Sequence, residues 1–396
     1  MVRFVHLADA HLGRRQYGLE ERERDFLEAF NEAVDRTIQA RPEFVAFSGD
    51  LFDSYRPSPT TLVSAFVGLK RIVDSGVRVF AVAGNHDLGP VPGGGRSSPL
   101  PLFEKALEGG LVNLSYSRPV ERLDGVFVAG LPYTPRQEAE ALKSALDAIS
   151  RRVQVGSAQV VLILHQAVKP LVPPQKAEID RAVLDRLAFS YYAMGHVHDR
   201  NFPRRTSQRR PIAYSGSLEV VEEREADKLE VYGKGFYVVE LDGEEASISP
   251  VNLGSIRPFL VFRERVDSAE GLEELASRIE ARVAGGTWAK PPVVRVSLSS
   301  ARLDPRDVKD FQDALRDSLG QRVLKVFVRL RRLDEKLGEA EVSIEPKIDV
   351  EKIFGEIIPA ENVRRLAIEI YRLYLEGKGS RELIRELERI YEGWAP

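Results

Sequence analysis

The chain has 396 residues, more than one hydrophobic core usually organises, so its length predicts two domains or one domain with appendages. Hydrophobic residues make up 43% and charged residues 30% of the sequence, a composition typical of globular rather than disordered proteins. The lack of cysteine excludes disulfides and thiolate metal sites, and the formal net charge of -3 does not by itself indicate a nucleic-acid partner.

The sequence also argues against a membrane protein. No apolar run reaches the roughly 18 to 20 positions that a membrane-spanning helix needs. The N-terminus, MVRFVHLADAH, carries polar groups where a signal peptide would need an apolar run. We therefore expect an intracellular, cytoplasmic protein without a membrane partner.

The first 250 residues alternate short apolar runs with longer amphipathic segments. Strand-like runs lie at 2–9, 43–50, 77–87, 112–114, 125–133 and 158–165. Helix-like segments lie at 24–40, 60–76, 102–107 and 138–153. Apolar strands separated by helices are typical of an α/β fold whose strands are buried on both faces.

A second pattern begins near Ile256 and predicts a small βαβαβ unit of about 85 residues, large enough for a separate domain. Its strands are expected at 259–266, 293–300 and 323–330, and its helices at 271–284 and 307–319. A polar segment follows, and then two helices at 360–376 and 380–392. The patterns predict a main domain over 1–254, a smaller α+β domain over 255–335, a linker over 336–349 and a helical tail over 350–396.

Most histidines follow the predicted strands. Of the six, only His6 lies inside a strand; the others are His11, His86, His165, His196 and His198. Oxygen donors accompany them: Asp9, Asp50, Asp53, Asn85 and Asp87. Because ligands of open α/β sheets bind beyond the carboxyl ends of the strands, we expect these side chains to converge.

Two spacings indicate paired donors. Asp9 and His11, and likewise His196 and His198, are two positions apart, which would place each pair on one side of an extended segment, where it could hold one ion. The candidate ligands are Asp9, His11, Asp50, Asn85, His165, His196 and His198. They suffice for two ions that share a carboxylate, and nitrogen and oxygen donors without sulfur suit Mn, Fe or Zn.

Each of these groups alone also has a structural explanation. A histidine inside a strand, such as His6, is more often a core residue than a ligand. Asp53 could be the N-cap of a helix that follows the loop SYRPSP. Because several such groups occur in order and use nearly every histidine of the chain, we favour a shared site.

The same groups resemble a known family. The segments Asp9-Ala-His11, Gly49-Asp50-Leu-Phe-Asp53, Gly84-Asn85-His86-Asp87, His165 and Gly195-His196-Val-His198 are similar to the signature of the calcineurin-like metallophosphoesterase superfamily. HLADAHLG, GDLFDSYRPSP and YSGSLE look more narrowly like segments of the archaeal and bacterial double-strand-break-repair nucleases, the SbcD-type partners of a coiled-coil ATPase. The resemblance implies a mixed β-sandwich flanked by helices for the first domain, and a DNA-binding cap for the second.

The resemblance also implies how the donors divide. Asp9, His11, Asp50 and His198 would hold one ion, and Asp50, Asn85, His165 and His196 the other, with Asp50 as the bridge. His86 would be the catalytic acid. Some relatives carry histidine where this chain has Asp53, which leaves a catalytic role for Asp53 open.

A site of this kind predicts phosphodiester hydrolysis. Two ions roughly 3.5 to 4 Å apart stabilise the attacking and leaving oxygens, and one bound water becomes hydroxide near neutral pH. The leaving sugar oxygen needs a proton, for which His86 is the candidate. The resemblance implies a Mn²⁺-dependent exo- and endonuclease in the nucleoid, acting on duplex ends, hairpins and single strands during double-strand-break processing.

A cluster of arginines after His198 is a candidate DNA-binding surface, since its charge density suits phosphate contacts. It consists of Arg200, Arg204, Arg205, Arg209 and Arg210, to which we add Ser215 and Ser217 of the YSGSLE segment. The alternative is an ordinary solvated loop.

The tail and two body helices are candidate protein interfaces. The tail helices each carry an apolar face, which the resemblance implies would bind the coiled coil of an SMC-like ABC ATPase; docking on the cap is the alternative. The resemblance also implies a homodimer through helices near Leu62, Phe66, Leu100 and Phe103.

Two other functions fit parts of the sequence. A cyclic-nucleotide or nucleotide phosphodiesterase, or a protein phosphatase, would share the motifs, but would not need the second domain and the tail. A non-enzymatic scaffold would not need the intact set of donors with His86 beside it. We therefore predict a DNA nuclease.

Overall fold

The computed structural model describes residues 1–91, 94–153, 159–200, 204–243 and 245–333. The linker predicted over 336–349 and the helical tail predicted over 350–396 lie outside these residues. Met1–Arg331 form one compact unit. Within the described residues, no helix combines the length and apolarity that crossing a bilayer requires.

Two mixed six-stranded sheets form the centre of the fold, in the orders β16-β15-β1-β2-β3-β6 and β13-β14-β12-β9-β8-β7. The strands of the first sheet are β1 Val2–Leu7, β2 Phe44–Phe47, β3 Arg78–Ala81, β6 Leu111–Asn113, β15 Gly235–Asp242 and β16 Glu245–Asn252. Those of the second are β7 Val120–Leu123, β8 Val126–Leu131, β9 Gln159–His165, β12 Tyr191–Gly195, β13 Arg204–Arg205 and β14 Pro211–Tyr214. The central strands of both sheets run parallel. Antiparallel strands lie at both edges of the second sheet and at one edge of the first, whose other edge strand, β6, is parallel.

The two sheets pack face to face through an apolar core. Phe4 of β1 stacks on Phe44 of β2 with ring centroids 4.9 Å apart, and Tyr191 of the opposite sheet packs edge-on against Phe4 at 5.2 Å. Because both faces of the central strands are covered, they are apolar throughout rather than alternating. This arrangement confirms the predicted α/β fold with a mixed β-sandwich.

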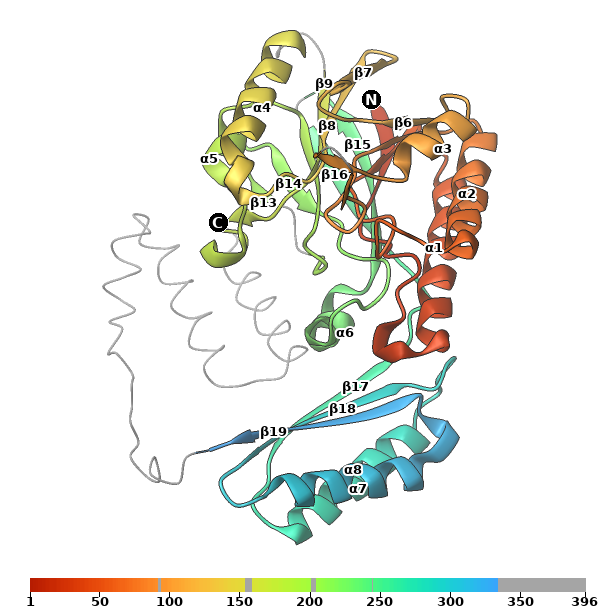
Figure 1. The fold of residues 1–396 in the computed structure, drawn as a ribbon, viewed down its shortest axis with the longest axis vertical. Helices are drawn as coiled ribbons and strands as arrows, with labels where there is room; N and C mark the ends of the chain where they lie inside the picture. Colours follow the sequence, from red (N-terminus) through yellow and green to blue (C-terminus); the bar gives the residue numbers. More distant parts are fainter. Residues whose placement is uncertain (92–93, 154–158, 201–203, 244, 334–396) are drawn as a thin grey trace, which may run out of the picture. The chain divides into compact units, whose positions relative to one another are not determined.

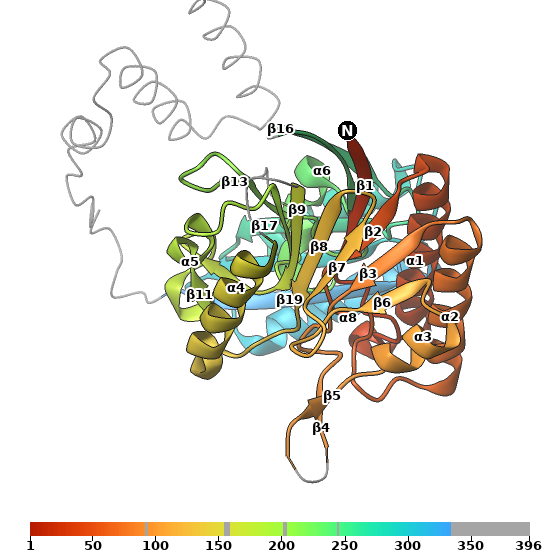
Figure 2. The ribbon, with the colours of Figure 1, turned by 90° about the horizontal axis from the view of Figure 1, so that it is seen from above.

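Helices cover the outer face of each sheet (Figures 1 and 2). The first sheet carries α1 Glu20–Ala40, α2 Pro59–Asp74 and α3 Leu100–Ala106, and the second carries α4 Ala139–Val153 and α5 Arg181–Asp185. α2 begins at Ser58, whose side chain accepts a hydrogen bond from the Thr61 N–H, with Pro59 in the first turn. The suggestion that Asp53 is the N-cap of this helix is therefore wrong.

Shorter elements complete the body. They are the strands β4 Gly89–Pro90, β5 Arg96–Ser97, β10 Val168–Lys169 and β11 Ile179–Asp180, the helix α6 Leu229–Tyr232, and the 3-10 helices η1 Gln16–Gly18, η2 Arg136–Glu138, η3 Pro174–Lys176 and η4 Glu223–Lys228. A further 3-10 helix, η5 Gly320–Arg322, lies in the predicted second unit. Residues of η4 line the same cavity as the predicted ligands His196 and His198.

A third, three-stranded sheet forms from the predicted second unit, in the order β17-β18-β19. Its elements are β17 Phe259–Arg265, α7 Ala269–Ala284, β18 Val293–Ser300, α8 Pro305–Leu319 and β19 Lys325–Arg332. Alternate residues of β18, such as Val294 and Val296, are buried in a separate core beneath α7 and α8. Arg295, between them, points to the opposite face. The domain boundary at 254–255 stays a prediction, because this small sheet belongs to the same compact unit as the body.

Buried charges hold the small sheet to α1. Asp25 accepts from the Arg257 guanidinium at 2.5 and 2.9 Å, from Lys290 Nζ at 3.0 Å and from Arg22 at 2.6 Å. These cations hold the pKa of Asp25 below its usual range although burial opposes ionisation. Removing one partner from a buried ion pair costs about 3 to 5 kcal/mol, so this cluster fixes where the small sheet attaches.

Candidate metal centre

The predicted ligands converge at one edge of the sandwich, and both sheets contribute. Asp9, Asp50 and Asn85 follow β1, β2 and β3 of the first sheet. His165 ends β9 and His196 follows β12 of the second sheet. Parallel strands bring residues from distant parts of the chain to the same edge, as expected from the sequence.

The donors form two adjoining groups that share Asp50, and a third group joins His11 to Asp53 and His86. One consists of Asp9, His11, Asp50 and His198, and the other of Asp50, His165 and His196; within each group the donor atoms lie within 4.8 Å of one another. Oδ1 of Asn85 lies 3.1 Å from Nε2 of His165 and so adjoins the second group. These are the sets that the resemblance implied, with Asp50 common to both. The expectation that His196 and His198 hold the same ion is wrong, because they lie in different groups.

Left-handed backbone, not an extended segment, aims several of these side chains. Asp9, His11, Asp50 and His196 have φ values of 54°, 46°, 53° and 84°. A residue in this region costs of order 1 to 3 kcal/mol, so its surroundings must hold it there. The Asp9 N–H donates to the carbonyl of Gly49 at 3.0 Å, and the His196 N–H donates to the Asp9 carboxylate at 3.1 Å.

Two glycines make room for the turns. A Cβ added to Gly84 would collide with the backbone and carboxylate of Asp50, and a Cβ added to Gly195 would collide with the carbonyl of Ser48. Only glycine permits these close approaches. Both glycines stand directly before predicted ligands, which explains the Gly-Asn and Gly-His pairs of the motifs.

Asp50 carries an unpaired oxygen between the two groups. Its Oδ2 is buried and accepts no well-formed hydrogen bond, while Nε2 of His165 and Nε2 of His11 lie 3.3 and 3.7 Å away. Burial opposes its charge, but neighbouring histidines, His165 foremost, hold the pKa of Asp50 well below its usual range. A buried, ionised oxygen without a hydrogen bond is costly. The donor set therefore fits divalent cations on either side of Asp50.

Outer partners form hydrogen bonds to three of the four ligand histidines, and a carboxylate lies near the fourth. Asp53 lies 3.2 Å from Nδ1 of His11, the Ser48 carbonyl 2.7 Å from Nδ1 of His165, Glu225 3.0 Å from Nδ1 of His198, and Glu178 3.5 Å from Nε2 of His196. Such partners fix the ring and the tautomer of a ligating histidine. Sequence reasoning missed Glu178 and Glu225, because neither belongs to a motif.

His86 stands beside the donors without joining a group that includes Asp50. Its Nδ1 lies 2.9 Å from the backbone carbonyl of Asp53. A carbonyl only accepts hydrogen bonds, so Nδ1 carries a proton there and Nε2 remains for other chemistry. The side chain is 36% exposed and lines a cavity of about 660 Å³, together with Asn85, His196 and His198.

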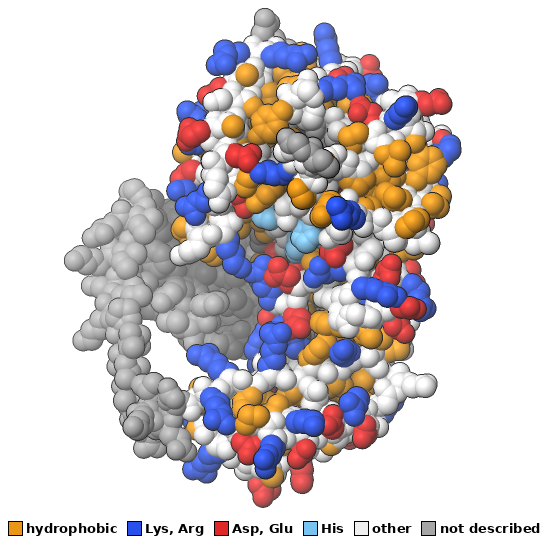
Figure 3. All heavy atoms as spheres, viewed as in Figure 1, with side chains coloured by type: hydrophobic (Ala, Val, Ile, Leu, Met, Phe, Trp, Pro, Cys, Tyr) orange, Lys and Arg blue, Asp and Glu red, His pale blue; other side chains and the backbone are white. Residues whose placement is uncertain are grey.

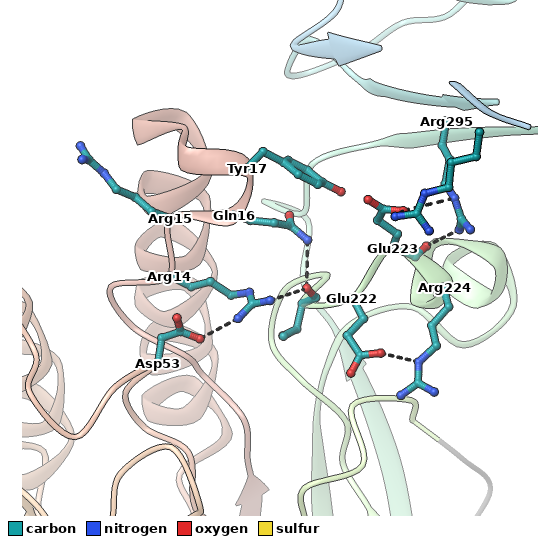
Figure 4. Close-up of a pocket in the computed structure, with 11 residues that line it drawn as sticks. Arg14, Arg15, Gln16, Tyr17, Asp53, Glu222, Glu223, Arg224 and Arg295 are labelled. Carbon is teal, nitrogen blue, oxygen red and sulfur yellow. Dashed lines mark hydrogen bonds and ion pairs between the residues drawn. The ribbon is translucent and has the colours of Figure 1, made fainter. Parts of the chain in front are cut away.

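The histidines are visible at the surface within a hollow bordered by basic and acidic side chains (Figure 3). Next to the cavity lies a cleft of about 570 Å³, to which Glu222 and Arg224 also contribute. In this cleft Arg14 donates to Asp53 at 2.8 Å and to the carbonyl of Val221 (Figure 4). Asp53 thus joins Arg14 to His11 and has a supporting position.

The predicted arginine cluster divides into exposed and buried members. Arg204, Arg205 and Arg209 are exposed, and Arg210 is half-buried. Arg200 is only 4% exposed, and its guanidinium donates to Oδ1 of Asn252 at 2.6 Å.

The two serines are buried as well. Ser215 and Ser217 have no exposed surface, and Ser217 donates to the carbonyl of Glu219 at 2.7 Å. These serines and Arg200 are therefore unavailable for DNA contacts, and the prediction is wrong for them.

His6 is a core residue, as expected for a histidine inside a strand. It is fully buried, and its Nδ1 lies 3.0 Å from the Tyr191 hydroxyl. Burial lowers the pKa of His6 to about 3, so the ring is neutral.

Comparison with known proteins covers both the site and the rest of the chain. The family model described as calcineurin-like phosphoesterase matches residues 2–200. The DNA double-strand break repair protein Mre11 of Methanocaldococcus jannaschii is 26% identical over 97% of both chains. The proteins of the same name from Methanococcus maripaludis and Saccharolobus solfataricus are 29% and 33% identical, over 90% and 65% of both chains.

Proposed function

The chain belongs to the calcineurin-like phosphoesterase family, and from this premise we propose that it is a metal-dependent DNA nuclease of double-strand-break repair. The observation that carries the proposal is the pair of donor groups that share Asp50. Relatives named DNA double-strand break repair protein Mre11, similar over most of the chain, support DNA as the substrate. We place the protein inside the cell with the chromosome.

The chain's own residues have distinct tasks in this proposal. Asp9, His11, Asp50 and His198 would hold one cation, and Asp50, Asn85, His165 and His196 the other. Two bound divalent cations, Mn²⁺ by preference, would supply water activation and stabilise charge on the phosphate.

His86 would deliver the proton to the leaving sugar oxygen from Nε2. The Asp53 carbonyl accepts a hydrogen bond from Nδ1 of His86, which leaves Nε2, on the other side of the ring, for the cavity. The cavity beside it, of about 660 Å³, has the usual size of a ligand site.

Substrate assays with the full chain test this function. With Mn²⁺, we expect cleavage of labelled linear duplex and hairpin DNA, by exo- and endonuclease action, and negligible hydrolysis of cyclic nucleotides. Hydrolysis of cyclic nucleotides without cleavage of DNA would replace the nuclease by a small-molecule phosphodiesterase.

The exposed arginines Arg204, Arg205 and Arg209 are proposed to bind DNA phosphates. Replacing all three by alanine should weaken DNA binding at low salt, and should reduce the slope of log affinity against log salt by about 0.9 for each phosphate that the variant leaves unneutralised. Fluorescence anisotropy at several salt concentrations measures both. Arg118→Ala, which removes an exposed arginine outside both the arginine cluster and the proposed cap, is the control. An unchanged slope in the triple variant would remove these arginines from the DNA path.

A homodimer through α2 and α3 is also proposed, with a corrected set of residues. Leu100 and Phe103 are buried in the core and Leu62 and Phe66 are partly buried, so those side chains are not the exposed contacts. The exposed apolar side chains on these helices are those of Val63, Val67 and Leu102, which are 62%, 51% and 59% exposed.

Sedimentation tests the dimer. The double variant Val63→Glu and Val67→Glu should sediment as a monomer where the wild type sediments as a dimer, because two charges on an apolar interface prevent its burial. A dimer that persists in the variant would place the interface elsewhere.

The segment 350–396 is proposed to bind the coiled coil of an ATPase partner, and 255–335 to act as a DNA-binding cap. Deleting 350–396 should abolish co-purification with the ATPase encoded in the same organism and spare Mn²⁺-dependent cleavage, because the donors all lie before residue 200. Retained co-purification would assign the interface to the body.

A further inference from the structure

The 3-10 helix η4, Glu223–Lys228, lies between the metal centre and the small sheet. Glu225 contacts the predicted ligand His198, while Glu223 and Asp227 contact arginines of the small sheet. We infer that Glu225 is a positioning residue for His198, and that η4 couples this positioning to the attachment of the small sheet. The inference rests on the proposed metal-dependent function.

The hydrogen bond from His198 to Glu225 sets the chemistry of the ring. Nδ1 of His198 lies 3.0 Å from Oε1 of Glu225, and because a carboxylate accepts, Nδ1 carries the proton. Nε2 is then unprotonated and faces the donor group, 3.2 Å from Nε2 of His11. This is the tautomer in which His198 can bind a cation.

Glu225 is itself held on all sides. It is 2% exposed, and its carboxylate accepts from Lys234 Nζ at 2.5 Å and from the N–H groups of Val221 and Glu222 at 3.1 and 2.9 Å. Lys234 also donates to the carbonyl of His198 at 3.0 Å. Glu225 and Lys234 therefore fix both the ring and the backbone of His198.

The neighbouring acids of η4 reach the small sheet. Arg295 of β18 donates to the carbonyl of Glu223 at 2.9 Å and lies 3.6 Å from its carboxylate (Figure 4), and 3.8 Å from that of Asp227. Arg329 of β19 pairs with Glu223 at 3.2 Å, and Arg263 of β17 pairs with Asp227. Each of the three strands β17, β18 and β19 therefore contributes an arginine that pairs with an acid of η4, the turn that carries Glu225.

A simpler role for Glu225 is to neutralise the buried Lys234. That role predicts a change in stability when Glu225 is replaced, but no selective change in cation affinity. The second group supplies an internal comparison, because Glu178, 10% exposed, lies 3.5 Å from Nε2 of His196, a looser contact than the 3.0 Å between Glu225 and Nδ1 of His198. Each carboxylate should therefore affect only one of the two cation sites.

The test is calorimetric titration of the metal-free, full-length protein with Mn²⁺, without DNA. Glu225→Gln should weaken one of two binding events by about 10- to 100-fold, and Glu178→Gln should weaken the other. Unchanged affinities in folded Glu225→Gln protein, or loss of the same event in both variants, would overturn the positioning role.

A second variant guards against misfolding, since Glu225→Gln alone leaves Lys234 buried without its counter-charge. Glu225→Gln combined with Lys234→Met removes both charges and should fold, as thermal melting will check. The double variant should still lose affinity at the same cation site. Wild-type affinity in this protein would show that Glu225 only balances Lys234.

A substitution in the small sheet, away from the metal ligands, tests the coupling. Arg295→Ala should lower affinity at the site that Glu225→Gln affects, by several-fold, and Arg295→Lys should restore part of it. Arg278→Ala, which removes an exposed pair with Glu264, is the control. Equal affinities in Arg295→Ala and Arg278→Ala would overturn the coupling. A wild type that binds two Mn²⁺ but does not cleave DNA would refute the nuclease and leave these results standing.

Discussion

Replacing Asp50 by asparagine is expected to abolish tight binding of both cations and all measurable DNA cleavage. The asparagine keeps the size of the side chain. It can also keep the oxygen that accepts from the backbone N–H of His86, 2.9 Å from Oδ1 of Asp50. It removes the charge and converts the unpaired oxygen, which lies between Nε2 of His165 and Nε2 of His11, into a donor or a weaker ligand. Because this residue is common to both groups, one substitution should affect two ions.

Metal analysis after gel filtration with Mn²⁺ measures this effect directly. The wild type should retain two ions per chain and Asp50→Asn fewer than one, while the melting curve shows that the variant is folded. Asp35→Asn, which removes a carboxylate from an exposed pair with Arg71, should retain two. Two ions retained in Asp50→Asn would contradict a shared carboxylate.

His86→Ala is expected to keep both ions and to lose about 10²- to 10⁴-fold in turnover, the usual contribution of a general acid or base. His86 lies outside the two groups that share Asp50, and its Nδ1 is occupied by the Asp53 carbonyl. Without the imidazole, the leaving sugar oxygen would depart unprotonated. Turnover at saturating DNA, measured beside metal content, separates this defect from loss of binding.

His165→Ala is the matched comparison for His86→Ala. It removes a histidine of the same site, but one whose donor atom belongs to the second group. It should therefore lose metal as well as turnover. If His86→Ala also loses both ions, His86 is a ligand or a structural residue and not the acid.

The sequence predicted an α/β fold with strands buried on both faces because its core strands are apolar throughout, whereas the β-sandwich was implied only by the family resemblance. Runs such as Val160–Leu164 can be buried on both faces, and the helices between them carry one apolar stripe each. The candidate ligands could be found because a parallel topology brings strand ends together and because histidine is rare in this chain.

Handedness of the backbone could not be predicted from spacing. Asp9 and His11 are two positions apart, which suggested an extended segment, but both adopt positive φ. The close approaches at Gly84 and Gly195, before the ligands Asn85 and His196, involve atoms of Asp50 and Ser48 that follow another strand. Local pattern contains no information about such contacts.

The sequence pattern also could not predict which polar residues are buried. Arg200 belongs to an arginine-rich run, yet its partner Asn252 lies 52 positions away, and Tyr237 stacks under its guanidinium. Glu225 has no motif around it, because its role depends on a lysine nine positions later and a histidine 27 positions earlier. Outer partners of this kind become visible only in three dimensions.

The most direct test of the account is the anomalous diffraction of crystals grown with Mn²⁺. We expect two peaks per chain, roughly 3.5 to 4 Å apart, both within bonding distance of the Asp50 carboxylate. One peak should adjoin His198 and the other His165. A single peak, or two peaks of which only one contacts Asp50, would contradict the shared-carboxylate site.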